Sequence, residues 1–360
     1  MKTSRFLTQQ VHAAWQRKGL ISTVLLPLSW VVRLFILQKR QRHRQQPLSR
    51  PQTGLPVIVV GNLVVGGTGK TPVVIALCQA LQAQGWRPGI ISRGYGARIG
   101  AEPQVGQGSL SPLLFGDEPA LIAHSTQAPV AVHPRRALAL QALQHHYPEV
   151  NVVIADDGLQ HLALERDIEI VVQDARGLGN GRVLPAGPLR EPADKLAHVD
   201  IVITNLTAGQ PAPAPLPIDA TQLIMQLAPS TMTHLVSGDS LSWDQWHADY
   251  NDATLSAVAA IGQPERFFSM LRACGLALDK TQALPDHDPF DHSPFQALSS
   301  QLILITAKDA VKCARFNDDR LWVVNVDPQF SDPAWLDRLQ DRLRAIAQDK
   351  KRRGELNSRS

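Results

Sequence analysis

Short apolar runs recur along the middle of the chain and alternate with stretches of helical spacing. The runs are "VIVV" from Val57, "GIIS" near Ile90, "PVAV" near Val130, "NVVIADD" near Val153, "IEIVV" near Ile170 and "DIVITN" near Ile203. Apolar residues fall on one helical face in "TPVVIALCQALQAQG" and in "RRALALQALQHH". Buried strands that alternate with helices are typical of a mostly parallel sheet with helices on both faces. The pattern therefore predicts an α/β fold.

A second set of strands is predicted beyond a break rich in proline and alanine. The break, "TAGQPAPAPLP", runs from Thr207 to Pro217, and the apolar runs after it are "HLVSG", "AVAAIG", "LILIT" and "LWVVNV". Such a break marks a candidate domain boundary. We expect an N-terminal helix and basic linker over residues 1–50, a first α/β domain over 51–210, a smaller second α/β domain over 211–345 and a disordered tail over 346–360.

The N-terminal part contains one long apolar stretch, "LISTVLLPLSWVVRLFIL", from Leu20 to Leu37. It is short for a membrane-spanning helix, which needs about 20 residues. No small-residue cleavage site follows it, which disfavours a signal peptide. A spanning helix, a helix lying in the membrane interface and a buried helix of a soluble domain all remain open. Trp30 and the basic run "QKRQRHR" that follows favour one of the two membrane-associated forms.

Charge adds to this picture because it is unevenly spread. The 360 residues are 44% apolar and carry a formal net charge of +4. Basic residues crowd two short stretches, one holding Lys39, Arg40, Arg42, Arg44 and Arg50 and the other Lys350, Lys351, Arg352 and Arg353. Clustered charge of this kind indicates an anionic surface as partner. Three cysteines lie far apart without metal-ligand spacing, which favours a reducing compartment and no disulfides.

A glycine-rich loop lies between the first predicted strand and its helix. The loop, "VVGGTGKTP", departs from the pattern G-x-x-x-x-G-K-[ST] only in its first glycine, which is Val64 here. The alternative is a turn with a chance Gly-Lys-Thr, but a strand before and a helix after favour a nucleotide site. Lys70 would reach the β- and γ-phosphates, and Thr71 would hold Mg²⁺. The expected nucleotide-binding residues are Val64, Val65, Gly66, Gly67, Thr68, Gly69, Lys70 and Thr71.

Two carboxylates end a predicted buried strand in "VVIADDGLQH". Asp156 and Asp157 stand where an acid of a P-loop protein contacts the magnesium shell, so we expect them to hold Mg²⁺ together with Thr71. The alternative is an ordinary turn, since "DDG" is a turn signal. His161, just beyond, is either a structural histidine or a substrate contact.

Three further loops carry polar side chains suited to an anionic substrate. In "FGDEPALIA", the spacing favours Asp117 as a helix cap, with a general base as the alternative. "SRGYG" offers Arg93 and Tyr95, and "LPAGPLREP" offers Arg190 and Glu191 for a sugar or phosphate. The alternative for the last loop is a solvated connection.

Eight stretches, in their order along the chain, together resemble the tetraacyldisaccharide 4′-kinases, the lipid A kinases of Gram-negative bacteria. They are "VGNLVVGGTGKTP", "ISRGYG", "GDEPALIA", "DDGLQH", "LPAGPLRE", "AAIGQPERFF", "LPDHDPF" and "TAKDAVKC", and they run from about Val60 to Cys313. The resemblance implies a P-loop kinase that uses ATP and Mg²⁺. Its implied reaction is phosphorylation of the 4′-hydroxyl of an acylated disaccharide 1-phosphate.

The resemblance also bears on residues whose roles the spacing leaves open. In the family, an Asp of the "GDEP" segment works with a His of the "PDH" segment, here Asp117 and His287. It therefore favours a catalytic pair over a simple cap at Asp117. The family's loop also begins with a residue other than glycine, so that Val64 belongs to a variant loop. One departure is Ala307, where the family usually has Glu in "T-E-K-D-A-V-K".

The implied partners are the acylated lipid substrate and the cytoplasmic face of the bacterial inner membrane, with no nucleic acid. Lys70 would hold the phosphates, and Asp117, oriented by His287, would accept the proton of the attacking hydroxyl. Two alternatives are a regulatory or partitioning ATPase and a soluble kinase of a small metabolite. The dependence of ATP turnover on an acceptor, and membrane association, distinguish the three.

Overall fold

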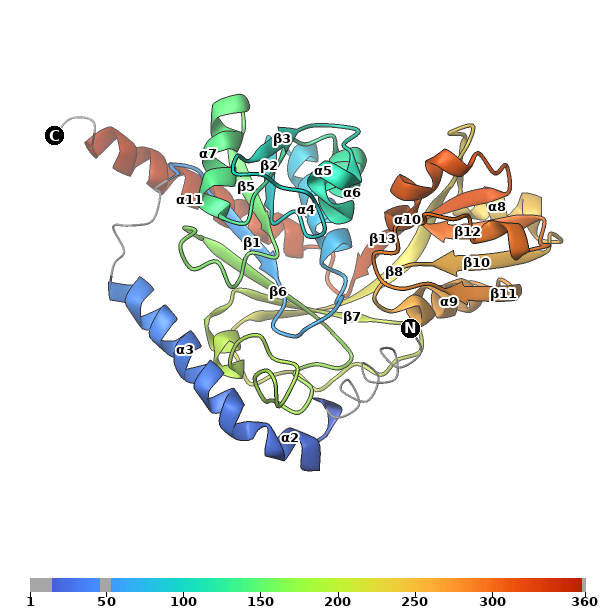
Figure 1. Cartoon of the computed structure of the whole chain (residues 1–360). Coiled ribbons are helices and arrows are strands. Elements are labelled where there is room, and N and C mark those ends of the chain that lie inside the picture. Colours follow the sequence, from blue (N-terminus) through green and yellow to red (C-terminus); the bar gives the residue numbers. More distant parts are fainter. Residues whose placement is uncertain (1–14, 46–52, 358–360) are drawn as a thin grey trace.

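A single large sheet runs through the computed structural model, which describes residues 15–45 and 53–357 (Figure 1). In the described residues the sheet has 13 strands in the order β11-β10-β12-β13-β8-β7-β6-β1-β5-β2-β4-β3, with β9 paired to β8. Only the β3–β4, β8–β13 and β8–β9 pairs are antiparallel. The predicted α/β class with a mostly parallel sheet is therefore confirmed.

The strands are β1 (Val57–Gly61), β2 (Pro88–Ser92), β3 (Gln104–Gly106), β4 (Val130–Val132), β5 (Val152–Asp156), β6 (Ile168–Asp174), β7 (Ile201–Leu206), β8 (Thr221–His234), β9 (Ser240–Ser242), β10 (Leu255–Ala259), β11 (Leu278–Ala283), β12 (Leu302–Thr306) and β13 (Leu321–Phe330). The α-helices are α2 (Leu20–Val24), α3 (Leu26–Gln45), α4 (Lys70–Ala83), α5 (Pro112–Phe115), α6 (Asp117–Thr126), α7 (Arg136–His146), α8 (Trp243–Tyr250), α9 (Pro264–Ala273), α10 (Ala307–Cys313) and α11 (Trp335–Asn357). The 3₁₀ turns are η2 (Ala193–His198), η3 (Phe295–Ala297) and η4 (Ala314–Phe316).

Helices cover both faces of the first half of the sheet because its strands are buried on both sides. In β1, Ile58 and Val60 join the core formed with α4, α6 and α11, while Val57 and Val59 join the core formed with α7 and η2. Alternate residues of a strand point to opposite faces, which explains this division. Uninterrupted apolar runs such as "VIVV" follow from it.

The break over residues 207–217 is a loop, but the sheet continues across it. The long strand β8 pairs with β7 at its beginning and with β13 along most of its length. Beyond it, β10, β12 and β13 form a second pair of apolar clusters with α8, α9 and α10. Figure 1 shows this second half as the yellow-to-orange lobe on the right.

One of the predictions for this second half is wrong. "HLVSG" is not a strand: β8 ends at His234 and the chain turns through Gly238, whose φ is +77°. The turn is closed by the His234 N–H, which donates to the carbonyl of Asp239 at 2.8 Å. The strand lies earlier, over residues 221–234, where only Leu223, Met225 and Met232 are buried, so that the sequence has no continuous apolar run there.

The predicted disordered tail is also wrong for residues 346–357, which continue helix α11. This helix returns to the first half of the molecule, where Trp335, Leu339 and Leu343 are buried in the core with α4. Near its end, Lys350 pairs with Glu165 at 3.1 Å and Asp167 at 2.8 Å. The polar composition therefore belongs to the solvated face of an amphipathic helix. Residues 358–360 lie outside the described part of the chain.

The N-terminal apolar stretch forms α2 and α3, which lie along the outside of the first half (Figure 1). Val32 and Ile36 pack against the core, whereas nine apolar side chains are exposed: Leu20, Ile21, Val24, Leu28, Trp30, Val31, Leu34, Phe35 and Leu37. Among the described residues, no helix has the length and apolar character needed to cross a membrane. Arg50 of the predicted basic cluster falls outside the described residues.

The packing of α11 predicts a measurable contribution to stability. Leu343→Ala should lower the free energy of unfolding by about 2–5 kcal/mol, because it empties a fully buried site. The matched control is Arg344→Ala on the exposed face of the same helix, which should change stability by about 0.5 kcal/mol or less. Urea denaturation of the two variants measures the difference. Equal midpoints would contradict the docking of α11 on the first core.

Candidate active site

A cavity of about 1790 Å³ opens at the carboxyl ends of the central strands, between the two halves. Ligand sites of open parallel sheets are expected at this edge. The first half contributes the glycine-rich loop and the ends of β2, β5 and β7. The second half contributes side chains that follow β10, β11 and β12, among them Gln263, Arg266, Asp286, His287 and Lys308.

The loop before α4 has the backbone geometry of a phosphate cradle. Gly69 caps the helix with φ of +92°, and Gly66 has φ of +99°. A Cβ at Gly69 would lie 2.1 Å from Asn205 Nδ2, which donates to the carbonyl of Thr68 at 3.1 Å. Glycine is therefore required at position 69 both by the left-handed backbone and by the close approach of Asn205.

Val64, where the common pattern has glycine, has a structural role of its own. Its side chain is 3% exposed and packs in the core, and its backbone forms an antiparallel bridge with Leu189. The next residue, Val65, donates its N–H to the carbonyl of Pro188 at 2.9 Å. The start of the loop is thus held like a short strand, a conformation that valine favours.

Asp157 forms the centre of a charged cluster facing the phosphate cradle. Lys70 Nζ lies 3.4 Å from one of its oxygens, and Arg190 donates to both at 3.1 and 3.0 Å. Burial would raise the pKa of this carboxyl, but Lys70 and Arg190 outweigh that effect and hold the pKa below its usual range. Asp157 therefore stays ionised and keeps two cations beside the cradle.

Asp156 has one carboxylate oxygen without a partner among the described residues. Its Oδ2 accepts from Ser92 Oγ at 2.9 Å, whereas Oδ1 is buried and unbonded. Burial, with the negative charge of Glu118 nearby, raises the pKa of Asp156 to about 6. An unsatisfied buried carboxylate oxygen needs an explanation, and a bound cation supplies one. With Asp157 and the cavity-lining Thr71, the oxygen donors fit Mg²⁺.

Asp117 and His287 come together although 170 residues separate them. The His287 Nδ1–H donates to Asp117 Oδ2 at 3.0 Å, and Lys312 Nζ approaches the same oxygen at 3.2 Å. Burial would raise the pKa of Asp117, but the His287 hydrogen bond and the Lys312 charge hold it below its usual range. The helix cap that the spacing favours at Asp117 is wrong, because Gly116 is the N-cap residue and no side chain caps α6.

His287, rather than Asp117, faces the cavity. His287 lines the cavity beside Tyr95, whose ring centroid is 5.3 Å from the imidazole centroid. Asp117 lies behind the imidazole, with its side chain 13% exposed against 29% for His287. A substrate in the cavity would therefore meet the pair at the imidazole ring.

Several residues that the sequence analysis did not single out also join the two halves. Lys308 Nζ lies 3.3 Å from Glu118 and 3.6 Å from Asp286. Gln263 Nε2 donates to the carbonyl of Gly67 at 3.3 Å and to Asp174 at 3.1 Å. All of these residues except Asp174 lie within the stretches "GDEPALIA", "AAIGQPERFF", "LPDHDPF", "TAKDAVKC" or the glycine-rich loop. Their position inside these motifs is the sequence signal that could have identified them.

The candidate substrate residues divide into two groups. Arg93, Tyr95, His161 and Arg190 line the cavity, and burial, together with the positive charge of neighbouring cations, lowers the pKa of His161 to about 4. Glu191 is not among the lining residues. Its carboxylate is buried and pairs with Arg40 of α3 at 2.6 Å, so it anchors the N-terminal helix.

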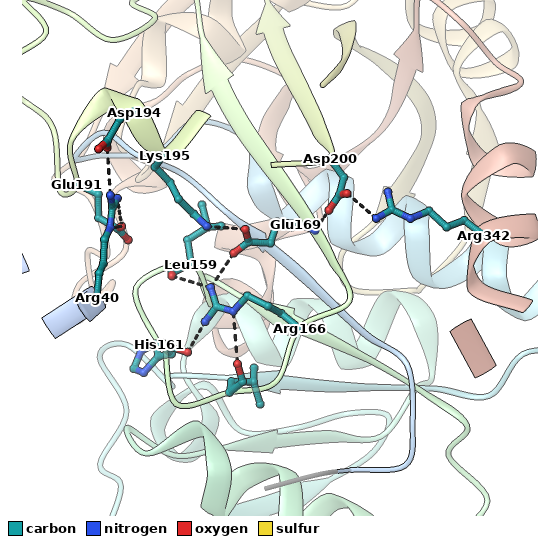
Figure 2. A network of polar contacts seen from close by, with 11 residues as sticks. Arg40, Leu159, His161, Arg166, Glu169, Glu191, Asp194, Lys195, Asp200 and Arg342 are labelled. Carbon is teal, nitrogen blue, oxygen red and sulfur yellow. Dashed lines mark hydrogen bonds and ion pairs between the residues drawn. The ribbon is translucent and has the colours of Figure 1, made fainter. Parts of the chain in front are cut away.

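Figure 2 shows how α3 and the loop after β5 are held to the rest of the first half. Arg40 reaches Glu191 and Asp194, while Arg166 donates to the carbonyls of Leu159 and His161. These carbonyls follow Asp157 in the chain. The network therefore fixes the backbone immediately after the two acidic residues of the site.

The buried face of the N-terminal helices also supports the glycine-rich loop. Ser29 Oγ donates to the carbonyl of Val183 at 2.7 Å and accepts from the N–H of Ala186 at 2.9 Å. Ser22 Oγ donates to the carbonyl of Ala186. Pro188 and Leu189, a few residues further, hold Val65 and Val64. The helix and the phosphate cradle are thus connected through a single loop.

A P-loop at the carboxyl edge of a parallel sheet, in a cavity that the hydrogen-bonded His287 and Asp117 border, is typical of a P-loop phosphotransferase of the α/β class. A family profile described as "Tetraacyldisaccharide-1-P 4'-kinase" matches residues 21–344. The chain therefore belongs to the tetraacyldisaccharide 4′-kinase family, and the family expected from the eight motifs is confirmed.

Individual relatives agree over nearly the whole length. The tetraacyldisaccharide 4′-kinase of Bordetella petrii is 51% identical over 357 residues, covering 96% of this chain and 99% of the relative. That of Herminiimonas arsenicoxydans is 43% identical over 342 residues, covering 92% and 94%. The crystal structure of "apo" form LpxK from Aquifex aeolicus in complex with ATP matches with a TM-score of 0.76 at 25% identity, covering 90% of this chain and 99% of that one.

Lys312 should set the pH range in which the Asp117–His287 pair works. Its positive charge favours the ionised form of Asp117, so Lys312→Met should raise the pKa of Asp117 and move the acidic limb of the kcat profile to higher pH. Lys312→Arg keeps the charge and should leave the limb near its original position. Kinase assays across the acidic range measure this shift. An unmoved limb in a destabilised Lys312→Met protein would assign Lys312 a structural role only.

Proposed function

We propose that the cavity transfers the γ-phosphate of ATP to the 4′-hydroxyl of an acylated disaccharide 1-phosphate, at the cytoplasmic face of the bacterial inner membrane. Family membership supports the reaction, which belongs to lipid A biosynthesis. The observation that carries the proposal is the Asp117–His287 pair in the same cavity as the P-loop, because it supplies a base to which an attacking hydroxyl could lose its proton.

The nucleotide end of the site is built to neutralise and position phosphates. The N–H groups of the loop and the amino end of α4 would cradle the phosphates, and Lys70 would exchange Asp157 for the β- and γ-phosphate oxygens. Thr71, Asp156 and Asp157 would hold Mg²⁺, which would supply positive charge to offset that of the phosphates. No group of three or more His, Cys, Asp or Glu able to hold a metal occurs in the described residues.

The acceptor end depends on the order of the groups behind the cavity. The imidazole of His287 lies between Asp117 and the cavity, so the hydroxyl proton would reach the pair at the ring. Asp117 fixes the ring through Nδ1 and stabilises the imidazolium that forms. This reverses the order expected from the sequence, in which Asp117 was the direct acceptor. Arg93, Tyr95, His161 and Arg190 surround the space that the sugar phosphate would occupy.

Membrane attachment would come from α2 and α3 lying in the interface. Their exposed apolar side chains form a face too extensive for an ordinary soluble surface. Trp30 is 64% exposed, and the basic residues Lys39 and Arg42 follow at the end of α3. An apolar face flanked by aromatic and basic residues is typical of a helix that lies on an anionic membrane. The acylated substrate would then be reached without leaving the bilayer.

Acceptor-dependent transfer tests the proposal directly. Purified protein with labelled ATP should move label into lipid only when the acylated disaccharide 1-phosphate is present. Lys70→Ala should remove this activity without lowering thermal stability, because Lys70 stabilises phosphate charge and does not build the core. ATP consumption that ignores the acceptor would indicate a regulatory ATPase. Normal transfer by folded Lys70→Ala would contradict the assignment of the loop.

The Asp117–His287 pair should behave as one unit in kinetics. Asp117→Ala and His287→Ala should each lower kcat by about 10²–10⁴-fold, the range of general-base catalysis, with a smaller change in the KM for ATP. The double variant should be little worse than the poorer single variant, because members of a catalytic unit are not additive. Measurements of kcat at saturating ATP and Mg²⁺ decide this. Multiplicative losses would mean that the two residues act independently.

A further inference from the structure

A second, smaller cavity lies beside the N-terminal helix, apart from the nucleotide cleft. It measures about 250 Å³ and shares no lining residue with the larger cavity. One wall is α3, with Leu26, Ser29, Trp30 and Arg33, and the other is formed by residues 181–183 and 192–194. The cavity is large enough for a phosphate group and the atoms next to it.

Positively charged side chains outnumber negatively charged ones around this cavity. Arg33 is exposed and makes no hydrogen bond or ion pair with another described residue. Among the described residues, the Arg182 guanidinium donates only to neutral hydroxyls, at 2.9 Å to Ser22 and 3.3 Å to Thr23. The carboxylate in the wall, Asp194, already accepts from Arg40 at 3.0 Å. Two guanidinium groups therefore border the cavity without a carboxylate partner of their own.

The position of the cavity indicates where its ligand would come from. Trp30 both lines it and is 64% exposed, and the neighbouring exposed residues Leu28, Val31 and Leu34 belong to the apolar face of α3. If that face lies in a membrane interface, as proposed above, the cavity opens at the depth of lipid headgroups. Guanidinium groups bind phosphate oxygens in a fixed, often bidentate geometry.

We propose that this cavity binds the phosphate of an anionic glycerophospholipid of the bilayer, held by Arg33 and Arg182. The site rests on the membrane attachment proposed for α2 and α3. A bound headgroup would fix the helix at one rotation about its axis. Because Ser22 and Ser29 tie the same helices to the loop that supports Val64 and Val65, the lipid would also orient the phosphate cradle toward the membrane.

Vesicle binding with matched arginine variants tests the site. Full-length wild-type protein should sediment with phosphatidylcholine vesicles containing phosphatidylglycerol better than with phosphatidylcholine alone. Arg42→Gln is the control, because Arg42 is an exposed arginine of the same helix outside the cavity. It should weaken binding by about fivefold at most, the effect of one surface charge. Arg33→Gln should weaken binding to the mixed vesicles by about tenfold or more, because it removes hydrogen bonds as well as charge.

Arg182→Gln should behave like Arg33→Gln, and Arg182→Lys should retain part of the binding. Since Arg182 also contacts α2, its variants are compared with wild type only if their thermal unfolding midpoints are the same. If the midpoints differ, the test uses the exposed residue Arg33 only. A second assay titrates the soluble lipid dihexanoyl phosphatidylglycerol into wild type and Arg33→Gln, where saturable binding lost in the variant is expected.

Three results would overturn the site. Equal losses for Arg33→Gln and Arg42→Gln would reduce it to general electrostatic attraction. A raised KM for the acylated disaccharide 1-phosphate in detergent, with vesicle binding unchanged, would assign the cavity to the phosphate of the substrate. Wild-type protein that binds neither kind of vesicle would refute the membrane attachment itself. It would not refute the proposed reaction, because kinase activity in detergent is tested separately.

Discussion

The structure depends on one contact, in which the beginning of the phosphate loop is held as a strand against the loop over residues 183–190. The Val65 N–H bonded to Pro188 and the bridge between Val64 and Leu189 make this contact. On one side it fixes the cradle at the start of α4. On the other side, the same loop is hydrogen-bonded to Ser22 and Ser29 of the N-terminal helices. The nucleotide site and the helix that would bind the membrane therefore share one support, and removing the helix would disturb both.

A second constraint is electrostatic and joins the two halves across the cavity. Asp117, at the amino end of α6, is contacted by His287 and Lys312 from the second half, and Glu118 is contacted by Lys308. These contacts are partly buried, so they are less screened by salt than surface pairs. The contact between Asp117 and His287 exists only when the halves are together. If this pair is the base, as proposed, closure of the two halves would assemble it.

Much of the site could be predicted because its chemical groups belong to short motifs of neighbouring residues. The strand, the glycine-rich turn and the following helix are set by nearby residues, so Lys70, Asp156 and Asp157 could be placed at one sheet edge. Errors arose where long-range contacts decide the outcome. Residues 346–357 are helical because they dock on a distant core, and Glu191 leaves the site because Arg40 pairs with it. The core on which residues 346–357 dock and the arginine that pairs with Glu191 are both far from these residues in the sequence.

The class of sheet, the nucleotide loop and the family could all be inferred from the sequence, because they follow from local spacing and from motifs in a fixed order. Three features became clear only from the folded chain: His287 lies between Asp117 and the cavity, Val64 forms a bridge with Leu189, and Lys312 contacts Asp117. Each of these depends on the distance and orientation of groups far apart in the chain. Spacing along a sequence carries no information about which of two bonded side chains faces solvent, since packing around both settles that.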